Sequence, residues 1–374
     1  MPQVSRRRIL AAGLGGAVMV AAGGVWRVTR NPVSAYEPWD VDSTPLSDIR
    51  LEALRHAILA PNPHNRQPWL IRLVGDREAV VTCDLAKRLP VTDPYDRQIT
   101  IGFGTFLELA RIAAAERGHA LEIESFPEGE DPRTLDTRPV AHLRFREGAA
   151  RDPLFAQITL RRSNKEEYDL ARTVPADALA QVMSSDGYTA DASRIVRLRG
   201  EILAAIEAEL TTPEPYMESV RLMRIGHREI DANPDGIDLG GPLFEGGSAL
   251  GLIDRDAMAD IDGTLAQQGV TMMRTTYGSI PALGWITTPG NTRKDQLEAG
   301  RRYVRANLRA TALGLSMHPM SQSLQEYREV APMFARVHEL LGATGEERVQ
   351  MLARIGYGPT IGPSPRWPLE THIA

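Results

Sequence analysis

The stretch Arg161–Asp169, RRSNKEEYD, decides the fold assignment because it places cations and a hydroxyl within five positions. Arg161, Ser163 and Lys165 alternate along it, directly after apolar residues at helical spacing. Guanidinium forks match the oxygens of a phosphate, and a serine hydroxyl adds a neutral donor. The stretch therefore indicates either a phosphate site at the end of a helix over residues 152–160 or an ordinary solvated basic helix end.

A second polar stretch lies about a hundred residues earlier in the chain. Residues 61–69, PNPHNRQPW, follow a helical pattern over residues 51–59 and precede an apolar run over residues 70–74. Proline rings fix backbone torsions, so this loop is stiff before any ligand arrives, and its amide side chains offer neutral donors and acceptors. The stretch indicates a preorganised binding loop or, read locally, a tight helix-to-strand turn.

A third stretch, residues 355–369, runs from an apolar strand pattern into a proline-rich tail that holds Arg366, which alone would be a surface arginine. Together, the three stretches resemble the FMN-dependent nitroreductase family from about residue 46 to the C-terminus. The family's flavin-phosphate motif, Arg-x-Ser-x-Arg/Lys, is matched by Arg161, Ser163 and Lys165. Arg366 is similar to the family arginine that contacts the phosphate from the C-terminal tail.

The family's flavin-edge loop, Pro-Ser-Ser-x-Asn-x-Gln-Pro-Trp, is also matched, except that Asn62 and Pro63 stand where the family has serines. Residues 313–322 resemble the family segment beside flavin N5, with Ser321-Gln322 in place of Glu-Gly. A backbone N–H at Gln322 is the group expected to face N5. The FMN-binding residues that the resemblance implies are Arg161, Ser163, Lys165, Arg366, Pro61, Asn62, Pro63, Asn65, Ser321 and Gln322.

The resemblance implies an oxidoreductase in which FMN carries the chemistry and the protein positions it. Hydride would pass through flavin N5 from NAD(P)H or another donor to a nitroaromatic, a quinone or a related small acceptor. Lys165 is expected beside the N1/O2 edge of the flavin, and no catalytic side chain or metal is required. The altered loop and Glu-Gly pair leave two other functions open: an FMN-storing or redox-sensing protein under a closed lid, and a relative that binds no flavin.

The order of the motifs predicts an internal duplication. Ordinary family members place the basic motif before the loop, and two subunits share each flavin, whereas here the loop comes first. We therefore expect an α+β, nitroreductase-like fold with a mixed sheet flanked by helices, duplicated into a pseudo-dimer with one flavin site per chain. Its halves are residues 46–148 and 149–374, and association of two chains is left open.

The first half is expected to hold a helix (51–59), strands (70–74, 79–83, 120–125, 140–145) and a long helix (98–117). The second half is expected to begin with the helix over residues 152–160, to contain a long helix over residues 293–313 and to end on a strand near residues 351–357. Glycine-rich residues 211–284 are expected to form either a helical insertion or a lid over the flavin.

Composition is that of a folded globular enzyme. The chain has 374 residues, of which 43% are hydrophobic and 24% are charged. A net charge of −5, with no basic stripe that interleaves aromatic residues, argues against a general nucleic-acid binder. A single cysteine, Cys83, excludes an intrachain disulfide. The expected ligand is therefore a small molecule.

The N-terminus has the pattern of a twin-arginine signal. Residues 5–10, SRRRIL, precede an apolar run rich in glycine and alanine, and small residues at 33–35 suit cleavage before Tyr36. Residues 1–35 are therefore assigned to a signal peptide that addresses the protein to the twin-arginine export machinery. The expected location is the periplasm or cell envelope, and retention of the signal as a membrane anchor is the alternative to cleavage.

Overall fold

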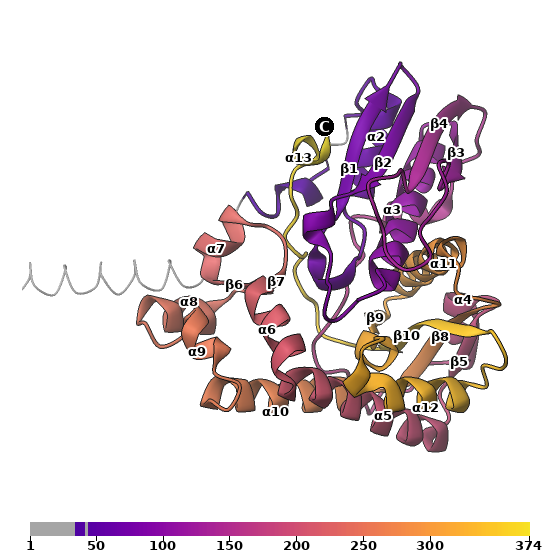
Figure 1. Cartoon of the computed structure of the whole chain (residues 1–374). Coiled ribbons are helices and arrows are strands. Elements are labelled where there is room, and N and C mark those ends of the chain that lie inside the picture. Colours follow the sequence, from indigo (N-terminus) through magenta and orange to yellow (C-terminus); the bar gives the residue numbers. More distant parts are fainter. Residues whose placement is uncertain (1–33, 42–43) are drawn as a thin grey trace, which may run out of the picture.

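A computed structural model of the chain describes residues 34–41 and 44–374. Residues 1–33 of the signal expected over residues 1–35 lie outside the described residues. Within the described ranges, no helix is both long enough and apolar enough to cross a bilayer. Two four-stranded sheets dominate the architecture, and each lies against its own helices (Figure 1). The α+β class expected from the sequence is confirmed.

The first half contains one sheet in the order β1-β2-β4-β3, with every neighbouring pair antiparallel. Its elements in chain order are α2 (Ile49–Ala57), β1 (Trp69–Val74), β2 (Glu78–Cys83), α3 (Arg97–Glu116), β3 (His119–Ser125) and β4 (Ala141–Glu147). The helices and strands expected in this half agree with these bounds to within two residues.

The second half repeats that arrangement in the order β5-β8-β10-β9, again antiparallel. Its elements are α4 (Ala176–Met183), β5 (Gly187–Thr189), β8 (Ala282–Thr288), α11 (Arg293–Ala312), β9 (Ser316–Pro319) and β10 (Arg348–Gly356). In both sheets the strands therefore lie in the order first, second, fourth, third. A 20-residue helix joins the second strand to the third in each.

Additional elements belong to the second half alone. Helix α12 (Ala331–Leu341) lies between β9 and β10, and residues 190–281, here called the insertion, separate β5 from β8. In Figure 1 the middle of the insertion extends sideways from the second sheet. Its elements are α5 (Ala192–Thr211), α6 (Pro213–Leu222), β6 (Met223–Ile225), α7 (Gly226–Ala232), β7 (Ile237–Leu239), α8 (Pro242–Ala249), α9 (Arg255–Ala259) and α10 (Thr264–Gly278).

The two long helices cross at a pair of glycines. A Cβ atom on Gly104 of α3 would collide with the carbonyl group of Leu297, and one on Gly300 of α11 would collide with that of Ile101. The contact is reciprocal, because each glycine faces the backbone of the other helix. Side chains of α11 also enter the core of the first half. The halves are therefore joined through a close helix–helix contact that only glycine permits.

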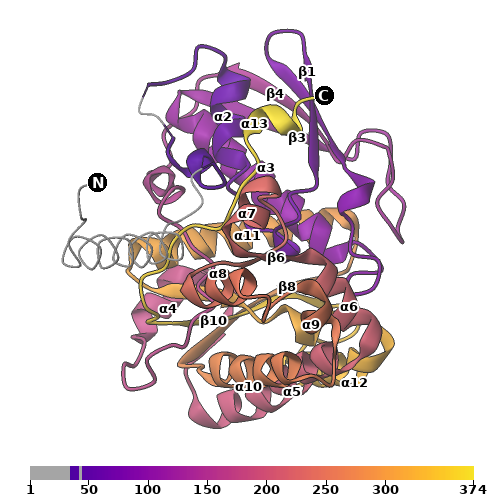
Figure 2. The ribbon, with the colours of Figure 1, turned by 90° about the vertical axis from the view of Figure 1, so that its left-hand side faces the viewer.

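The C-terminal tail returns from the second sheet to the first. After β10 it runs from the second half to the first along one side of the molecule and ends in α13 (Leu369–His372) beside β1 (Figures 1 and 2). Ile373 forms a parallel bridge to Ile71, and the N–H of Ala374 donates to the Ile71 carbonyl at 2.8 Å. The tail thus extends the first sheet at its β1 edge.

One expected element is wrong. The helix predicted over residues 152–160 is only a 3₁₀ turn, η4 (Pro153–Gln157), and the basic stretch follows as a loop. The Asp152 side chain caps the turn, but further along the N–H of Asn164 donates at 3.2 Å to the Met317 carbonyl on β9 instead of to a helical carbonyl. Hydrogen bonds to another part of the fold have replaced those of a helix.

Candidate functional site

The basic stretch Arg161–Lys165 is fixed by Asn164. The side-chain amide of Asn164 donates to the carbonyl of Pro359 at 2.7 Å, which ties the stretch to the C-terminal tail. Because the backbone is held on this side, the Arg161 side chain is buried, whereas Lys165 remains exposed. The alternating spacing of the motif therefore separates its cations into a buried one and an exposed one.

Arg161 lies in a pocket of neutral partners. Its guanidinium donates to the Leu59 carbonyl at 3.1 Å, to Asn307 Oδ1 at 3.1 Å and to Ser163 Oγ at 3.4 Å. Its buried Nε has no partner, and the Tyr303 hydroxyl beside Ser163 also lacks one with hydrogen-bond geometry. Burial lowers the pKa of Arg161 to about 10. A buried cation with unused donors is the environment expected for an anionic ligand.

Arg366 reaches the same place from the C-terminal tail. Its guanidinium donates to the carbonyls of residues 58–60 at the end of α2, at 3.0 to 3.3 Å, and also to Asn65 Oδ1. Burial, together with the nearby charge of Arg161, lowers the pKa of Arg366 to about 9. In the described part of the chain, the partners of both arginines are carbonyls, amides and a hydroxyl, so two buried positive charges meet without a bonded carboxylate.

The loop over residues 61–69 is strained as well as stiff. Its residues His64, Asn65 and Gln67 have φ of 45°, 51° and 51°, in the left-handed region that side chains with a Cβ rarely occupy. Asn62 stabilises the loop because its Oδ1 accepts from the Gln67 N–H at 2.7 Å. Strain of this kind persists where the surroundings over-determine the backbone, as at ligand sites.

The same loop holds the tail and the insertion. Asn65 Nδ2 donates to the Pro365 carbonyl at 2.9 Å, and Gln67 Oε1 accepts from the Trp367 N–H at 2.9 Å. Gln67 Nε2 donates to the Pro234 carbonyl of the insertion at 2.8 Å. The amide of Asn65, which is expected to contact the flavin, and that of Gln67 therefore fasten three distant segments together.

An aromatic residue covers the arginines. Trp39 belongs to residues 34–41, here called the strap, and its ring lies 4.8 Å from the Arg162 guanidinium, 5.3 Å from that of Arg366 and 5.7 Å from that of Arg161. Its indole N–H donates to the Ser364 carbonyl at 2.7 Å. These contacts are cation–π in character. The strap therefore closes one side of the cationic cluster.

The expected flavin-N5 segment lies beyond β9. Ser321 and Gln322 begin a 3₁₀ turn, η5 (Ser321–Leu324), and Gln322 lies beside Tyr277 of α10. The charge of Lys165, in the basic stretch, contributes to the lowered pKa of His318 on β9. Strand β9 thus links the two places where the family motifs lead one to expect the flavin.

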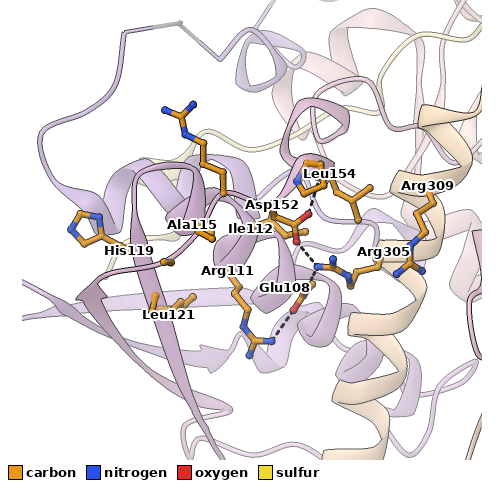
Figure 3. Close-up of a pocket in the computed structure, with 15 residues that line it drawn as sticks. Glu108, Arg111, Ile112, Ala115, His119, Leu121, Asp152, Leu154, Arg305 and Arg309 are labelled. Atoms are coloured by element: carbon orange, nitrogen blue, oxygen red, sulfur yellow. Dashed lines mark hydrogen bonds and ion pairs between the residues drawn. The ribbon is translucent and has the colours of Figure 1, made fainter.

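A separate cavity of about 540 Å³ lies between α3 and α11 (Figure 3). Arg305 bridges Glu108 and Asp152 there, at 2.8 Å from each, and Arg111 also pairs with Glu108 at 3.1 Å. Its charged groups are therefore mostly paired with one another. None of the residues expected to bind FMN lines this cavity.

Comparison with known proteins agrees with the motifs. No family model matches the chain. The chain is 26% identical over 337 residues to "Putative NAD(P)H nitroreductase Rv3131" of Mycobacterium tuberculosis, covering 84% of this chain and 90% of that protein. It is thus similar along most of its length to a protein named as a nitroreductase.

Two solved structures show a weaker likeness. The crystal structure of "a putative nitroreductase" from Anabaena variabilis covers 91% of this chain and 99% of its own, with 12% identity and a TM-score of 0.45. The FMN-dependent nitroreductase NfnB from Mycobacterium smegmatis, in complex with NADPH, covers 54% of this chain and 86% of its own, with 18% identity and a TM-score of 0.33.

Sequence reasoning missed Trp39, Tyr303 and Asn307 as neighbours of the basic stretch. Tyr303 and Asn307 lie one turn apart on α11. Residues at this spacing on a long helix usually indicate a face that packs in the core, not a ligand site. Trp39 follows the expected cleavage point, and no pattern there indicates a ligand. The sequence around Trp39 offers only a single aromatic residue in a short turn, and such a residue does not indicate a ligand site specifically.

Proposed function

We propose that this protein is an FMN-dependent oxidoreductase of the nitroreductase type, which takes electrons from NAD(P)H and reduces nitroaromatic, quinone or related small acceptors. One observation carries the proposal. The strained loop, the basic stretch and the tail arginine, which are far apart in the sequence, meet at the end of α2. The similarity to the protein named "Putative NAD(P)H nitroreductase Rv3131" supports it.

The buried cations fit the phosphate of FMN. Arg161 and Ser163 would hold it, the unpartnered Tyr303 hydroxyl would add a donor, and Arg366 would add positive charge from the tail. The loop at Pro61–Asn65 would support the ring system, with Lys165 near its N1/O2 edge and Ser321-Gln322 near N5. When bound, FMN supplies hydride transfer, and the residues of this chain bind it, orient it and exclude water.

We infer that the two halves are copies of one unit, with a single flavin site between them. The shared strand order and the reciprocal glycine contact support this inference. The long loop over residues 58–68 joins α2 to β1, whereas only residues 184–186 join α4 to β5. The second half therefore has too short a connection to build a second loop of the same kind.

The chain is further proposed to leave the cytoplasm by the twin-arginine route, with its cofactor already bound. Support comes from the SRRRIL pattern near the N-terminus. Cell fractionation of the full chain and of an Arg6→Lys, Arg7→Lys variant tests the route. Retention of only the variant in the cytoplasm is the expected result.

Flavin content tests the main proposal. We expect about one FMN per chain and bleaching of its absorbance by NADPH, with colour restored by a quinone or nitroaromatic. Arg161→Ala with Lys165→Ala should give a folded but colourless protein, because the phosphate and ring lose their cations. Arg301→Ala, on the outer face of α11 and paired with Glu298, is the matched control and should keep its flavin. Unchanged flavin absorbance in the double variant would refute the assignment.

A second function, FMN storage or redox sensing with little turnover, is favoured by one feature, the strap. Trp39 covers the cationic cluster and is itself held by the tail. If storage is the function, NADPH bleaches the native protein slowly and Trp39→Ala accelerates both flavin release and bleaching. If the protein turns over efficiently with the strap in place, the storage function is excluded.

A further inference from the structure

The most exposed large apolar side chains of the described residues gather at one place in the insertion. Leu243, Leu250 and Leu252 are 72%, 75% and 68% exposed, more than any other large apolar side chain in the described ranges. They lie on α8 and on the turn that follows it, and residues 242–252 are here called the apolar tip. Exposed apolar side chains are ordinarily scattered singly, so a group of this kind indicates a contact surface.

The apolar tip exposes no charge. Across residues 239–253 the one charged residue is Glu245, which is buried and whose Oε2 accepts from the His227 N–H of α7 at 2.9 Å. Leu243 and Leu250 are seven residues apart, about two helical turns, so they project from the same face of α8. A surface without charges to keep hydrated can leave water at little cost.

The backbone of the apolar tip is closed by its own hydrogen bonds. The N–H groups of residues 250–253 donate to the carbonyls of Gly246, Gly247 and Ser248 at 2.8 to 3.2 Å. On the inner side, the buried side chain of Ile253 fills the place that a Cβ atom on Gly247 would need. Backbone groups that are paired within a segment stay satisfied when that segment enters lipid. The leucines are therefore displayed on a folded support that suits an apolar environment.

The chain enters the described structure close to this tip. Ser34 Oγ donates to Asp231 Oδ1 of α7 at 2.9 Å, and α7, about 10 Å long, packs against α8. Figures 1 and 2 show the two helices together on one side of the molecule. The apolar run over residues 9–25 is joined to Ser34 by residues 26–33, which span at most about 30 Å. The apolar run is thus tethered beside the apolar tip.

The expected cleavage point lies inside the fold. Ala35 is 1% exposed, its N–H donates to Asp231 Oδ1 at 3.3 Å, and its carbonyl accepts from the Arg366 N–H at 2.8 Å. Peptidases cut exposed segments, whereas the bond between Ala35 and Tyr36 is held between the insertion and the C-terminal tail. In a protein that folds before export, the apolar run therefore stays attached to the strap.

We propose that the apolar tip lies in the surface of a lipid bilayer, to which the apolar run over residues 9–25 anchors the chain. The inference rests on the proposed export signal and not on FMN. Because the tether keeps the two apolar segments close together, a bilayer that receives the run also meets the tip. Stable attachment to a membrane ordinarily takes two such contacts, and the first raises the effective concentration of the second.

A fluorescent probe on the tip tests this contact. The full chain with Leu250→Cys is labelled with an environment-sensitive dye and reconstituted into phosphatidylcholine vesicles, and Cys83 is buried and stays unlabelled. We expect a blue shift and a severalfold rise in emission, with quenching by lipids that carry bromine in their acyl chains. High salt should change neither, because the tip exposes no charge. Val196→Cys, at an exposed apolar site on α5, is the matched control and should keep the emission of a dye in water.

Further variants and controls separate the bilayer from other occupants of the surface. Leu243→Ser with Leu252→Ser should remove most of the blue shift at position 250 and leave the unfolding temperature unchanged. A dye that is shielded without vesicles would mean that a second copy of the chain, or residues 9–25, covers the tip, and would overturn the proposal. An N-terminus at Tyr36 in the exported protein would overturn it as well. The probe reports the contact whether or not FMN is bound, so this proposal and the proposed function fail separately.

Discussion

The two halves share a strand order but differ in what covers their sheets. In the first half, strand β4 alternates buried and partly exposed residues, and its outer face carries ion pairs such as Arg146–Glu122 at 2.9 Å. In the second half, strand β8 is buried almost throughout, with α4 and α11 on one face and α5, α10 and α12 on the other. One topology thus accommodates an open sheet and a fully enclosed one.

The difference shows where each part of the proposed site originates. The half with the open sheet contributes the strained loop, which needs a long connection between α2 and β1. The enclosed half contributes the cations, and its additional helices bury the carboxyl group of Glu209. Enclosure on both faces creates an interior in which a carboxyl group can stay protonated near neutral pH.

The helix crossing joins the halves, so breaking it should have the largest effect. Gly104→Val places a branched side chain against the Leu297 carbonyl and should reduce the free energy of unfolding by at least about 3 kcal/mol. Denaturant unfolding measures it. Gly200→Ala, inside α5 with open space around it, is the control and should stabilise slightly. Equal effects at the two positions would mean that the crossing is not the joint.

Glu209 sharpens the comparison through pH. A carboxyl group whose pKa is higher in the folded protein than in the unfolded chain destabilises the fold once the pH exceeds the unfolded pKa. For Glu209 the destabilisation is complete once the pH exceeds the folded pKa of about 7. Glu209→Gln should therefore be more stable than the native protein at pH 8, by up to about 3 kcal/mol, and should lose that advantage near pH 4. Thermal unfolding at the two pH values measures this difference. A stability gap that does not change with pH would contradict the burial of a titrating carboxyl group.

Substitutions in the connection between the first helix and the first strand of each half should have an intermediate effect on the free energy of unfolding. Asn65→Ala removes the bond to the Pro365 carbonyl and a partner of Arg366, so it should cost about 1–3 kcal/mol and weaken FMN binding. Ser185→Ala, at the exposed turn of the second half, should change neither quantity. Flavin titration and unfolding of both variants check the contrast. A loss at Ser185 equal to that at Asn65 would argue for a second site.

The outer face of the first sheet should give the smallest effect. Arg146 and Glu122 are largely exposed, and such pairs contribute less than about 1 kcal/mol. Arg146→Ala should therefore lower stability by no more than about 0.5 kcal/mol, and less in high salt. Chemical denaturation of both proteins at two salt concentrations measures this difference in stability. A cost above about 2 kcal/mol would mean that this face is covered by something else.

The first half was predictable because local signals agree with its fold. Alternating polarity marks β4, and Gly118 ends α3 with the positive φ that favours glycine there. The helix over residues 152–160 was mispredicted because its apolar spacing carries no information on Asn164, whose partners lie on β9 and in the tail. Local periodicity cannot report hydrogen bonds to residues so distant in the chain.

Only those parts of the candidate site that belong to a recognisable sequence motif could be predicted. The structure brings the loop, the basic stretch and Arg366 together, as the family resemblance led us to expect. Glu209 could not be found in this way, because a glutamate on an amphipathic helix reads as a solvent-facing residue. Its burial depends on α6, α10 and η5. The residues close to position 209 in the sequence give no information on these contacts.

The bridge between Ile71 and Ile373 has a consequence for biosynthesis. Strand β1 leaves the ribosome about 300 residues before the segment that completes its edge. The first sheet can therefore form early but stays unfinished at one side until the segment around Ile373 has been made. Any chaperone that recognises an unpaired strand would hold the nascent polypeptide throughout that interval, and its release would report that this later segment has paired.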